Sequence, residues 1–178
     1  MHNIGRLKRT GSPCLTNTNG TLLTREVIDE LVECGFDELW VTTMAGTAEG
    51  YARTHPGTAP QTFERLKSCL RYLRERKTAR KRKAPLVNLV TIVIGANIRK
   101  MKEFADLALE VCADRVTFRP FKDIRGPGLA TLLPSPEDAT ALKAELKEIG
   151  RYLDSRGIPH NVSNFLMTFS RRFDTRAM

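Results

Sequence analysis

Long apolar runs are absent from this sequence of 178 residues. No stretch approaches the ~20 consecutive apolar residues that a membrane-spanning helix needs. Residues 1–10 are polar and basic and lack the apolar core of a secretory signal. We therefore expect a cytoplasmic protein without membrane contact. The overall composition, 41% hydrophobic and 28% charged residues, is typical of one globular domain with a sizeable core.

Cysteines are few and scattered. Cys14, Cys34, Cys69 and Cys112 form no CxxC pair, and none stands at a zinc-ligand spacing from a histidine. The pattern predicts no metal site in this chain, and the lack of a secretory signal argues against a disulfide framework. We interpret the four side chains as buried, reduced thiols, because free cysteine packs as a small apolar residue.

An excess of one sign of charge is confined to one segment of the chain. The net charge is +9, and residues 71–83 hold eight basic side chains and one acid, which leaves about +2 for the rest of the chain. Such a run can bind the phosphates of RNA or the carboxylates of an anionic peptide. No aromatic residue interleaves with its second half, so bases have no stacking platform there. We favour a solvated helix end over a nucleic-acid interface.

Hydrophobic spacing alternates between the helical and the strand period. Thr24 and Ser135 stand where helix-capping residues are expected, and Gly35 and Gly157 follow predicted helix ends. This alternation predicts βαβ units and a parallel sheet. The predicted helices cover residues 24–34, 60–76, 97–112 and 135–157, and the predicted strands cover residues 38–43, 86–94, 115–119 and 158–162.

Polar side chains gather where the predicted strands end. In parallel α/β sheets, whether barrels or doubly wound, the ligand site lies beyond the carboxyl ends of the strands. The residues that this rule selects are Thr18, Asn19, Thr42, Thr43, Arg119 and Lys122.

Each of the main candidates also has a purely structural interpretation. Asn19 precedes a glycine and can bond its own backbone in an Asn-Gly turn. Thr42 and Thr43 suit a strand by propensity alone. Arg119 can be a surface arginine, although an inward guanidinium would reach an anionic group. His55, in a Thr-His-Pro-Gly loop, is interpreted as a turn residue.

Several phrases resemble, in order, those of the radical S-adenosylmethionine (AdoMet) enzymes. Residues 18–23 (TNGTLL) are similar to the phrase that closes the third strand of that barrel, and residues 37–42 (DELWVT) to its fourth strand. Residues 46–57 are similar to the loop that follows, and residues 105–118 to the approach to the sixth strand. The resemblance spans residues 5–165. It implies a partial (β/α) barrel of about four to five parallel strands with helices outside.

The same resemblance implies AdoMet and a [4Fe-4S] cluster as cofactors of the full enzyme, which cleaves AdoMet reductively to start radical chemistry. It makes Asn19, Thr42, Thr43 and Arg119 the candidate cofactor-binding residues. The family's cysteine triplet and the glycine-rich phrase after its second strand have no counterpart in this sequence. Thr42 and Met44 also stand where many members have serine and aspartate.

These departures predict a chain that is inactive alone. Residues 4–13 resemble the end of the family's second helix, so we expect Met1 to fall inside an element of a truncated barrel. We predict a barrel domain over residues 1–169 and a disordered tail over 170–178.

The expected partners are a missing N-terminal segment or a second copy, and an unknown substrate. A non-catalytic nucleic-acid-binding α/β module that uses residues 71–83 is the alternative function.

Overall fold

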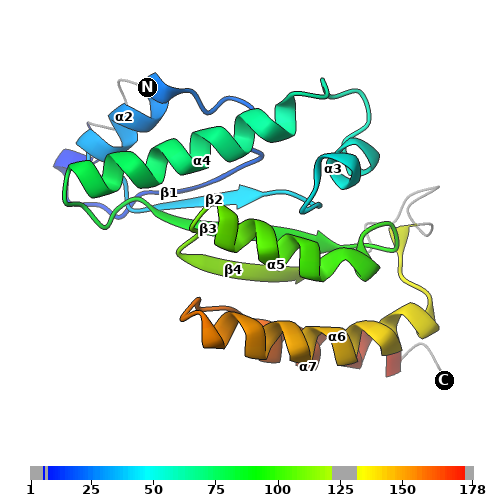
Figure 1. The fold of residues 1–178 in the computed structure, drawn as a ribbon. Helices are drawn as coiled ribbons and strands as arrows, with labels where there is room; N and C mark the ends of the chain where they lie inside the picture. The colour runs from blue at the N-terminus through cyan, green and yellow to red at the C-terminus, as the bar shows by residue number, and fades with distance from the viewer. Residues whose placement is uncertain (1–5, 7, 122–131, 175–178) are drawn as a thin grey trace.

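The computed structural model describes residue 6, residues 8–121 and residues 132–174. Helices and strands alternate along this part of the chain (Figure 1). None of its helices combines the length and the apolar character that crossing a lipid bilayer demands. The elements are β1 (Leu15–Thr18), α2 (Arg25–Glu33), β2 (Glu38–Thr42), α3 (Ala48–Thr54), α4 (Thr62–Ala79), β3 (Leu86–Val93), a 3-10 turn (Ile98–Lys100), α5 (Met101–Glu110), β4 (Arg115–Pro120), α6 (Pro136–Ser155) and α7 (Val162–Asp174).

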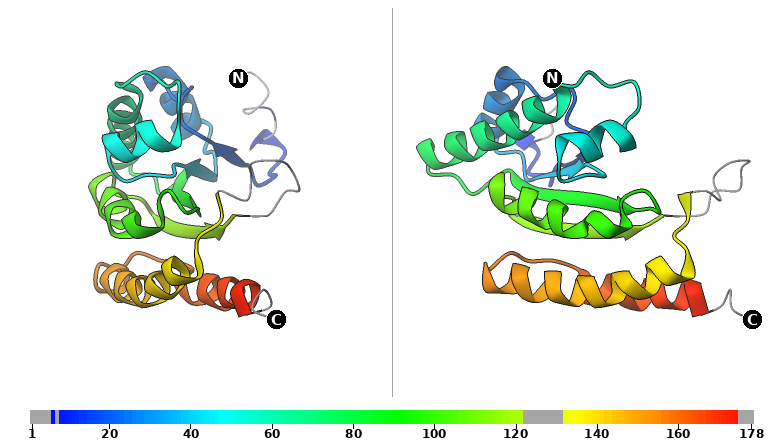
Figure 2. Two further views of the ribbon diagram at one scale, coloured as in Figure 1. Left: turned by 90° about the vertical axis from the view of Figure 1, so that its right-hand side faces the viewer. Right: turned by 45° about the vertical axis from the view of Figure 1, so that its right-hand side comes forward.

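The four strands form one parallel sheet in chain order, β1-β2-β3-β4. Within the described residues the sheet does not close on itself. Helices α2, α4, α5 and α6 lie along one side of the curved sheet (Figure 2). This arrangement confirms the predicted partial (β/α) barrel with its helices outside. Four strands are present in the described part of the chain.

Local sequence signals fix the helix boundaries. The Thr24 side chain accepts a hydrogen bond from the Val27 backbone N–H, and Ser135 does the same for Asp138 N–H at 3.1 Å. Gly35, with φ of 68°, ends α2 in the left-handed conformation that favours glycine. The predicted caps are therefore confirmed.

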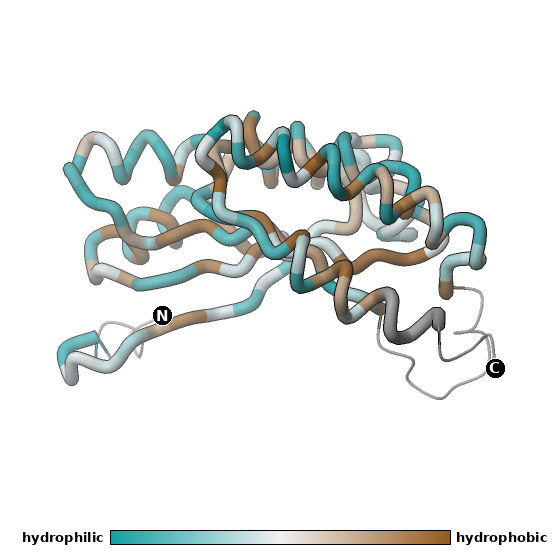
Figure 3. Tube along the Cα trace, turned by 90° about the horizontal axis from the view of Figure 1, so that it is seen from below, coloured by the Kyte–Doolittle hydropathy of each residue, from teal (hydrophilic) through white to brown (hydrophobic). Residues whose placement is uncertain are grey.

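One core holds the helices to the sheet. Apolar residues recur along the strands and helices (Figure 3), and the buried ones form a single cluster. Phe118 of β4 contacts Phe104 of α5 and Phe165 of α7 edge-on, with ring centroids 5.9 and 6.2 Å apart. These contacts, worth about 0.5–1.5 kcal/mol each beyond burial, attach α7 to the barrel core.

The predicted strand over residues 158–162 is wrong. Only one parallel bridge, Val116 to His160, forms there, and α7 begins at Val162. The side-chain amide of Asn161 explains the difference. It accepts from Phe118 N–H at 2.8 Å and donates to Phe118 C=O at 2.9 Å, so a side chain satisfies the β4 edge in place of a strand.

Two other expectations need correction. The predicted tail from residue 170 is helical as far as Asp174, and residues 175–178 lie outside the described residues, as does Lys122. The four cysteines are free as expected, but only Cys69 is buried, and Cys112 is exposed. Cys112 follows α5 with φ of 53°, so the chain reverses there at the surface.

Candidate functional site

The face of the sheet turned away from the helices is the candidate site, and we call it the open face. Leu39 and Val41 of β2 are buried against the helices, so the alternate residues Trp40 and Thr42 belong to the other face. Register extends this face to the other strands, because Asn17 and Asn88 both pair with Trp40. The open face comprises Leu15, Asn17, Glu38, Trp40, Thr42, Leu86, Asn88, Val90, Ile92, Arg115, Thr117 and Arg119.

Arg119 reaches across β3 to the tryptophan of β2. Its guanidinium carbon lies 4.7 Å from the centre of the Trp40 ring, which is a cation–π contact. At the amino end of the same face, Arg115 pairs with Glu38 at 3.4 Å. Arg115 thus has a carboxylate partner, whereas the charge of Arg119 rests on an aromatic ring and stays available to an anion.

Two buried hydrogen-bond donors lie beside this cation. Asn88 is 1% exposed, and its carbonyl oxygen accepts from the Thr117 hydroxyl at 2.9 Å. Its amide nitrogen and the Trp40 indole nitrogen are both buried, and neither finds a hydrogen-bond partner among the described residues. Buried donors without partners are costly and point to a ligand that would satisfy them. The open face therefore suits a ligand with negative or acceptor atoms.

The adjacent threonines at the end of β2 face opposite sides. Thr42 is half-buried on the open face. Thr43 is 0% exposed, its hydroxyl donates to Ala45 C=O at 3.1 Å, and its N–H donates to Val90 C=O at 2.9 Å. Thr42 can therefore meet a ligand on the open face, while the hydroxyl of Thr43 is already occupied inside the fold.

Asn19 forms the turn that its sequence allows. Its side-chain oxygen accepts from the Thr21 N–H at 3.1 Å and from the Thr21 hydroxyl at 2.8 Å. Gly20 between them takes φ of 75°. The geometry favours the turn interpretation for the Asn19 carbonyl, and a ligand contact by this exposed residue remains a prediction.

Asn97 organises the carboxyl ends of β2 and β3. Its amide nitrogen donates to Met44 C=O at 3.0 Å and to Ile92 C=O at 2.9 Å, and its oxygen accepts from Ile94 N–H at 2.9 Å. Asn97 precedes the 3-10 turn, but its side chain makes no cap bond there and instead joins two strand ends. Asn97 thus positions the backbone on which Thr42 stands.

His55 has a structural environment. Its ring stacks on Tyr51 with centroids 4.0 Å apart and planes at 11°, and its Nδ1 lies 3.0 Å from the Thr54 hydroxyl oxygen. Burial lowers the pKa of His55, and the Tyr51 carbonyl partly opposes this shift. The half-buried histidine therefore stays neutral near pH 7 and has a structural role in the turn that begins at its carbonyl.

The cysteines do not fit an iron-sulfur cluster. Cys14 precedes β1, Cys34 and Cys112 follow helices, and Cys69 lies within α4 with its thiol near Leu23 C=O. Across the described residues, which include all four cysteines, no group of three or more His, Cys, Asp or Glu side chains could hold a metal ion. Cluster ligation needs thiolates that converge.

Comparison with solved structures identifies the fold. The chain superposes on anSMEcpe solved with bound AdoMet and Cp18Cys peptide at a TM-score of 0.64, with 17% identity over 82% of this chain and 40% of that one. Streptococcus suis SuiB bound to S-adenosylmethionine gives 0.66, with 13% identity over 89% and 35%. A radical SAM methyltransferase from Sphaerobacter thermophilus gives 0.52, with 21% identity over 83% and 39%.

The fold is that of the radical SAM enzyme barrel, and the resemblance seen in the sequence is confirmed. No family model matches the sequence. A curated relative, the tungsten-containing aldehyde ferredoxin oxidoreductase cofactor-modifying protein of Pyrococcus furiosus, is 28% identical over 115 residues. The match covers 64% of this chain and 31% of that protein, so the chain spans about a third of the relative's length.

Sequence reasoning missed Trp40, Asn88 and Thr117. It searched only the ends of the strands, whereas these side chains meet in the middle of the face through register. The two-residue period of side chains along a strand is the signal that could have found Trp40, since Trp40 lies two residues before Thr42 and so belongs to the same face.

Proposed function

We propose that this chain is the later part of a radical SAM enzyme barrel and that its open face forms part of the AdoMet site. The observation that carries the proposal is the donor-rich surface around Trp40, Asn88 and Arg119 on an open parallel sheet of this fold. A ligand with carboxylate and hydroxyl groups, such as AdoMet, offers the acceptors that these donors lack.

Specific contacts follow from placement on the face. Arg119 would hold an anionic group, and its position over the Trp40 ring keeps the guanidinium oriented. Thr42 would offer its hydroxyl at the carboxyl end of β2. Asn19 is kept as a further contact through its amide nitrogen. Thr43 would act through the backbone position that it fixes, since its own hydroxyl bonds Ala45.

In the whole enzyme, the reduced cluster and AdoMet would supply a 5′-deoxyadenosyl radical, and the protein would bind, orient and exclude water. The four scattered cysteines support ligation of the cluster by residues outside this chain. The chain alone would then be inactive. SuiB was solved bound to its precursor peptide SuiA, so peptides are the first class of substrate to test here.

Affinity for AdoMet tests the binding surface. We expect Arg119→Gln to weaken AdoMet binding by about tenfold in calorimetry, because a charge-assisted hydrogen bond is lost. Arg115→Gln, which changes the same strand and face at the other end, is the matched control and leaves the affinity unchanged. Equal loss in both variants contradicts a site centred on Arg119.

Two threonines on different faces of the sheet, Thr42 and Thr16, give a second comparison. Thr42→Val removes a hydroxyl from the open face, and Thr16→Val makes the same change on the exposed opposite side of β1. We expect the first to weaken AdoMet binding by about threefold to tenfold, the worth of one hydrogen bond, and the second to have no effect.

Reconstitution with iron and sulfide tests the origin of the cluster. We expect the chain alone to form no stable [4Fe-4S] species under anaerobic conditions, by absorbance and electron spin resonance. A stable cluster signal from this chain would refute ligation from outside it.

A further inference from the structure

The basic segment 71–83 divides into two kinds of cation. Four of its eight basic side chains pair with acids of neighbouring elements and so join α4 to α2, to α5 and to the start of β4. These pairs are Arg71 with Glu110, Arg76 with Asp29 at 2.5 Å, Lys77 with Asp114 at 2.7 Å and Arg80 with Glu33 at 2.6 Å. Their charges serve the packing of the helices.

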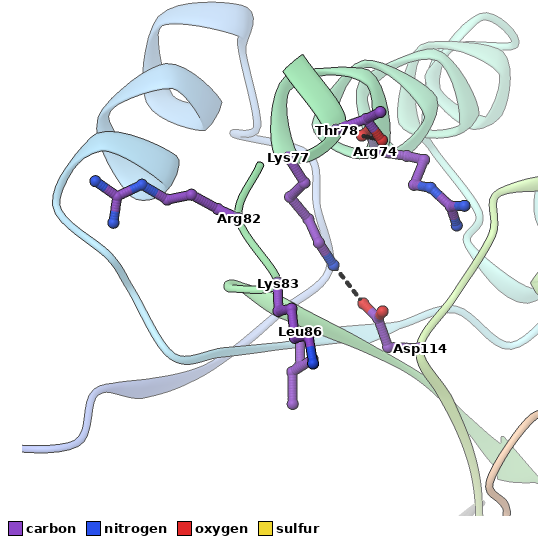
Figure 4. Close-up of a pocket in the computed structure, with 7 residues that line it drawn as sticks. All are labelled: Arg74, Lys77, Thr78, Arg82, Lys83, Leu86 and Asp114. Carbon is purple, nitrogen blue, oxygen red and sulfur yellow. Dashed lines mark hydrogen bonds and ion pairs between the residues drawn. The ribbon is translucent and has the colours of Figure 1, made fainter. Parts of the chain in front are cut away.

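The other four, Arg74, Lys81, Arg82 and Lys83, make no ion pair within the described part of the chain. Three of them border one cavity of about 300 Å³ together with Lys77, Thr78 and Asp114 (Figure 4). The cavity lies at the amino ends of the strands, because β3 starts beside it, and so it is away from Thr42 and Arg119. Surplus positive charge is therefore collected at one hollow instead of being spread along the segment.

A fixed ion pair forms the inner side of the cavity. Lys77 is 6% exposed, and its ammonium lies 2.7 Å from an Asp114 carboxylate oxygen. The same oxygen accepts from the Val87 N–H at 2.8 Å, so the carboxylate is held by backbone as well. Arg74 and Arg82 extend on either side of this pair in Figure 4. Four cations against one carboxylate leave three net positive charges around the cavity.

We propose that this cavity binds a compact polyphosphate group, such as the diphosphate of a small molecule. Guanidinium forks match phosphate oxygens, and the Thr78 hydroxyl adds a neutral donor. The volume is at the lower end of small-molecule sites, which run from about 300 to 1,000 Å³. The site is independent of the AdoMet surface and goes beyond the proposed function.

The lining distinguishes this ligand from a nucleic acid. No aromatic side chain borders the cavity among the described residues, so an unstacked base has no ring to pack on. A nucleic-acid interface is also marked by a basic stripe that follows the phosphate backbone, whereas three of the four free cations here border one hollow.

Binding of pyrophosphate to the whole chain tests the proposal. Calorimetry is expected to show saturable binding that falls by at least about tenfold in the double variant Arg82→Gln/Lys83→Gln, which removes two free cations from the cavity. The matched control Arg53→Gln/Arg151→Gln removes the same charge from exposed helix surfaces elsewhere and is expected to stay within about twofold. Circular dichroism checks that both variants are folded.

Three results would overturn the assignment. Wild-type protein that does not bind pyrophosphate removes the site. Equal loss in the control variant shows a general effect of net charge. Single-stranded RNA that binds with a steep salt dependence, is lost in Arg82→Gln/Lys83→Gln and is not displaced by pyrophosphate would favour the nucleic-acid-binding alternative instead.

Discussion

Replacing Asn97 should loosen the carboxyl ends of β2 and β3. The side chain is 3% exposed and makes three hydrogen bonds, to Met44 C=O, Ile92 C=O and Ile94 N–H. At about 1 kcal/mol of net stability for each bond, Asn97→Ala should lower the free energy of unfolding by about 3 kcal/mol. The buried backbone groups left without partners set the scale of this loss.

Urea unfolding followed by circular dichroism measures the effect. Asn164→Ala makes the same substitution on the exposed side of α7 and should stay within about 0.5 kcal/mol of the wild type. Asn97→Ala should also weaken AdoMet binding, because Thr42 stands two residues before Met44 on the strand end that Asn97 holds. A loss of stability below about 1 kcal/mol for Asn97→Ala would refute the argument that these three bonds join the strands.

Three further outcomes follow from burial, charge and the sheet edge. Thr91 is 0% exposed, and its hydroxyl has no hydrogen-bond partner in the part of the chain that the structure describes. Thr91→Val should therefore raise the free energy of unfolding by about 1 kcal/mol in urea, and a loss of stability would show that the hydroxyl is bonded. Burial lowers the pKa of His55 in the folded state, so the unfolded chain binds a proton at this residue more readily. The free energy of unfolding should therefore fall as the pH drops below about 6.5, and His55→Gln should flatten that fall. An unchanged pH profile in the variant contradicts this prediction. The outer edge of β1 has no paired strand in the described residues, and Leu15 is 50% exposed. The chain should therefore self-associate in size-exclusion chromatography, and Thr16→Lys should reduce the self-association. A monomeric wild type speaks against an open edge.

Much of the fold follows from spacing and end signals. Helices α2, α4, α5 and α6 and strands β2, β3 and β4 lie within a few residues of their predicted places, since apolar period and capping residues act locally. Residues 158–162 look like a strand, and only the tertiary bond of Asn161 to Phe118 shows what occupies the β4 edge. Helix α7, over Val162–Asp174, was not predicted.

The site was harder to predict than the fold. The rule that ligands lie beyond strand ends selects Asn19, Thr42 and Arg119 as candidates, but the opposite orientations of Thr42 and Thr43 depend on where the pleat places each residue. Trp40 and Asn88 become neighbours only through register. The division of the basic segment likewise depends on acids that other elements bring to α4.

Chemical-shift mapping by NMR tests the central claim that the open face is the AdoMet surface. Titration of the chain with AdoMet should shift the signals of the Trp40 indole, Thr42, Asn88 and Arg119 and leave those of the basic cavity unchanged. Shifts confined to the helix layer or to the cavity at Lys77, or no shifts at all, would contradict it.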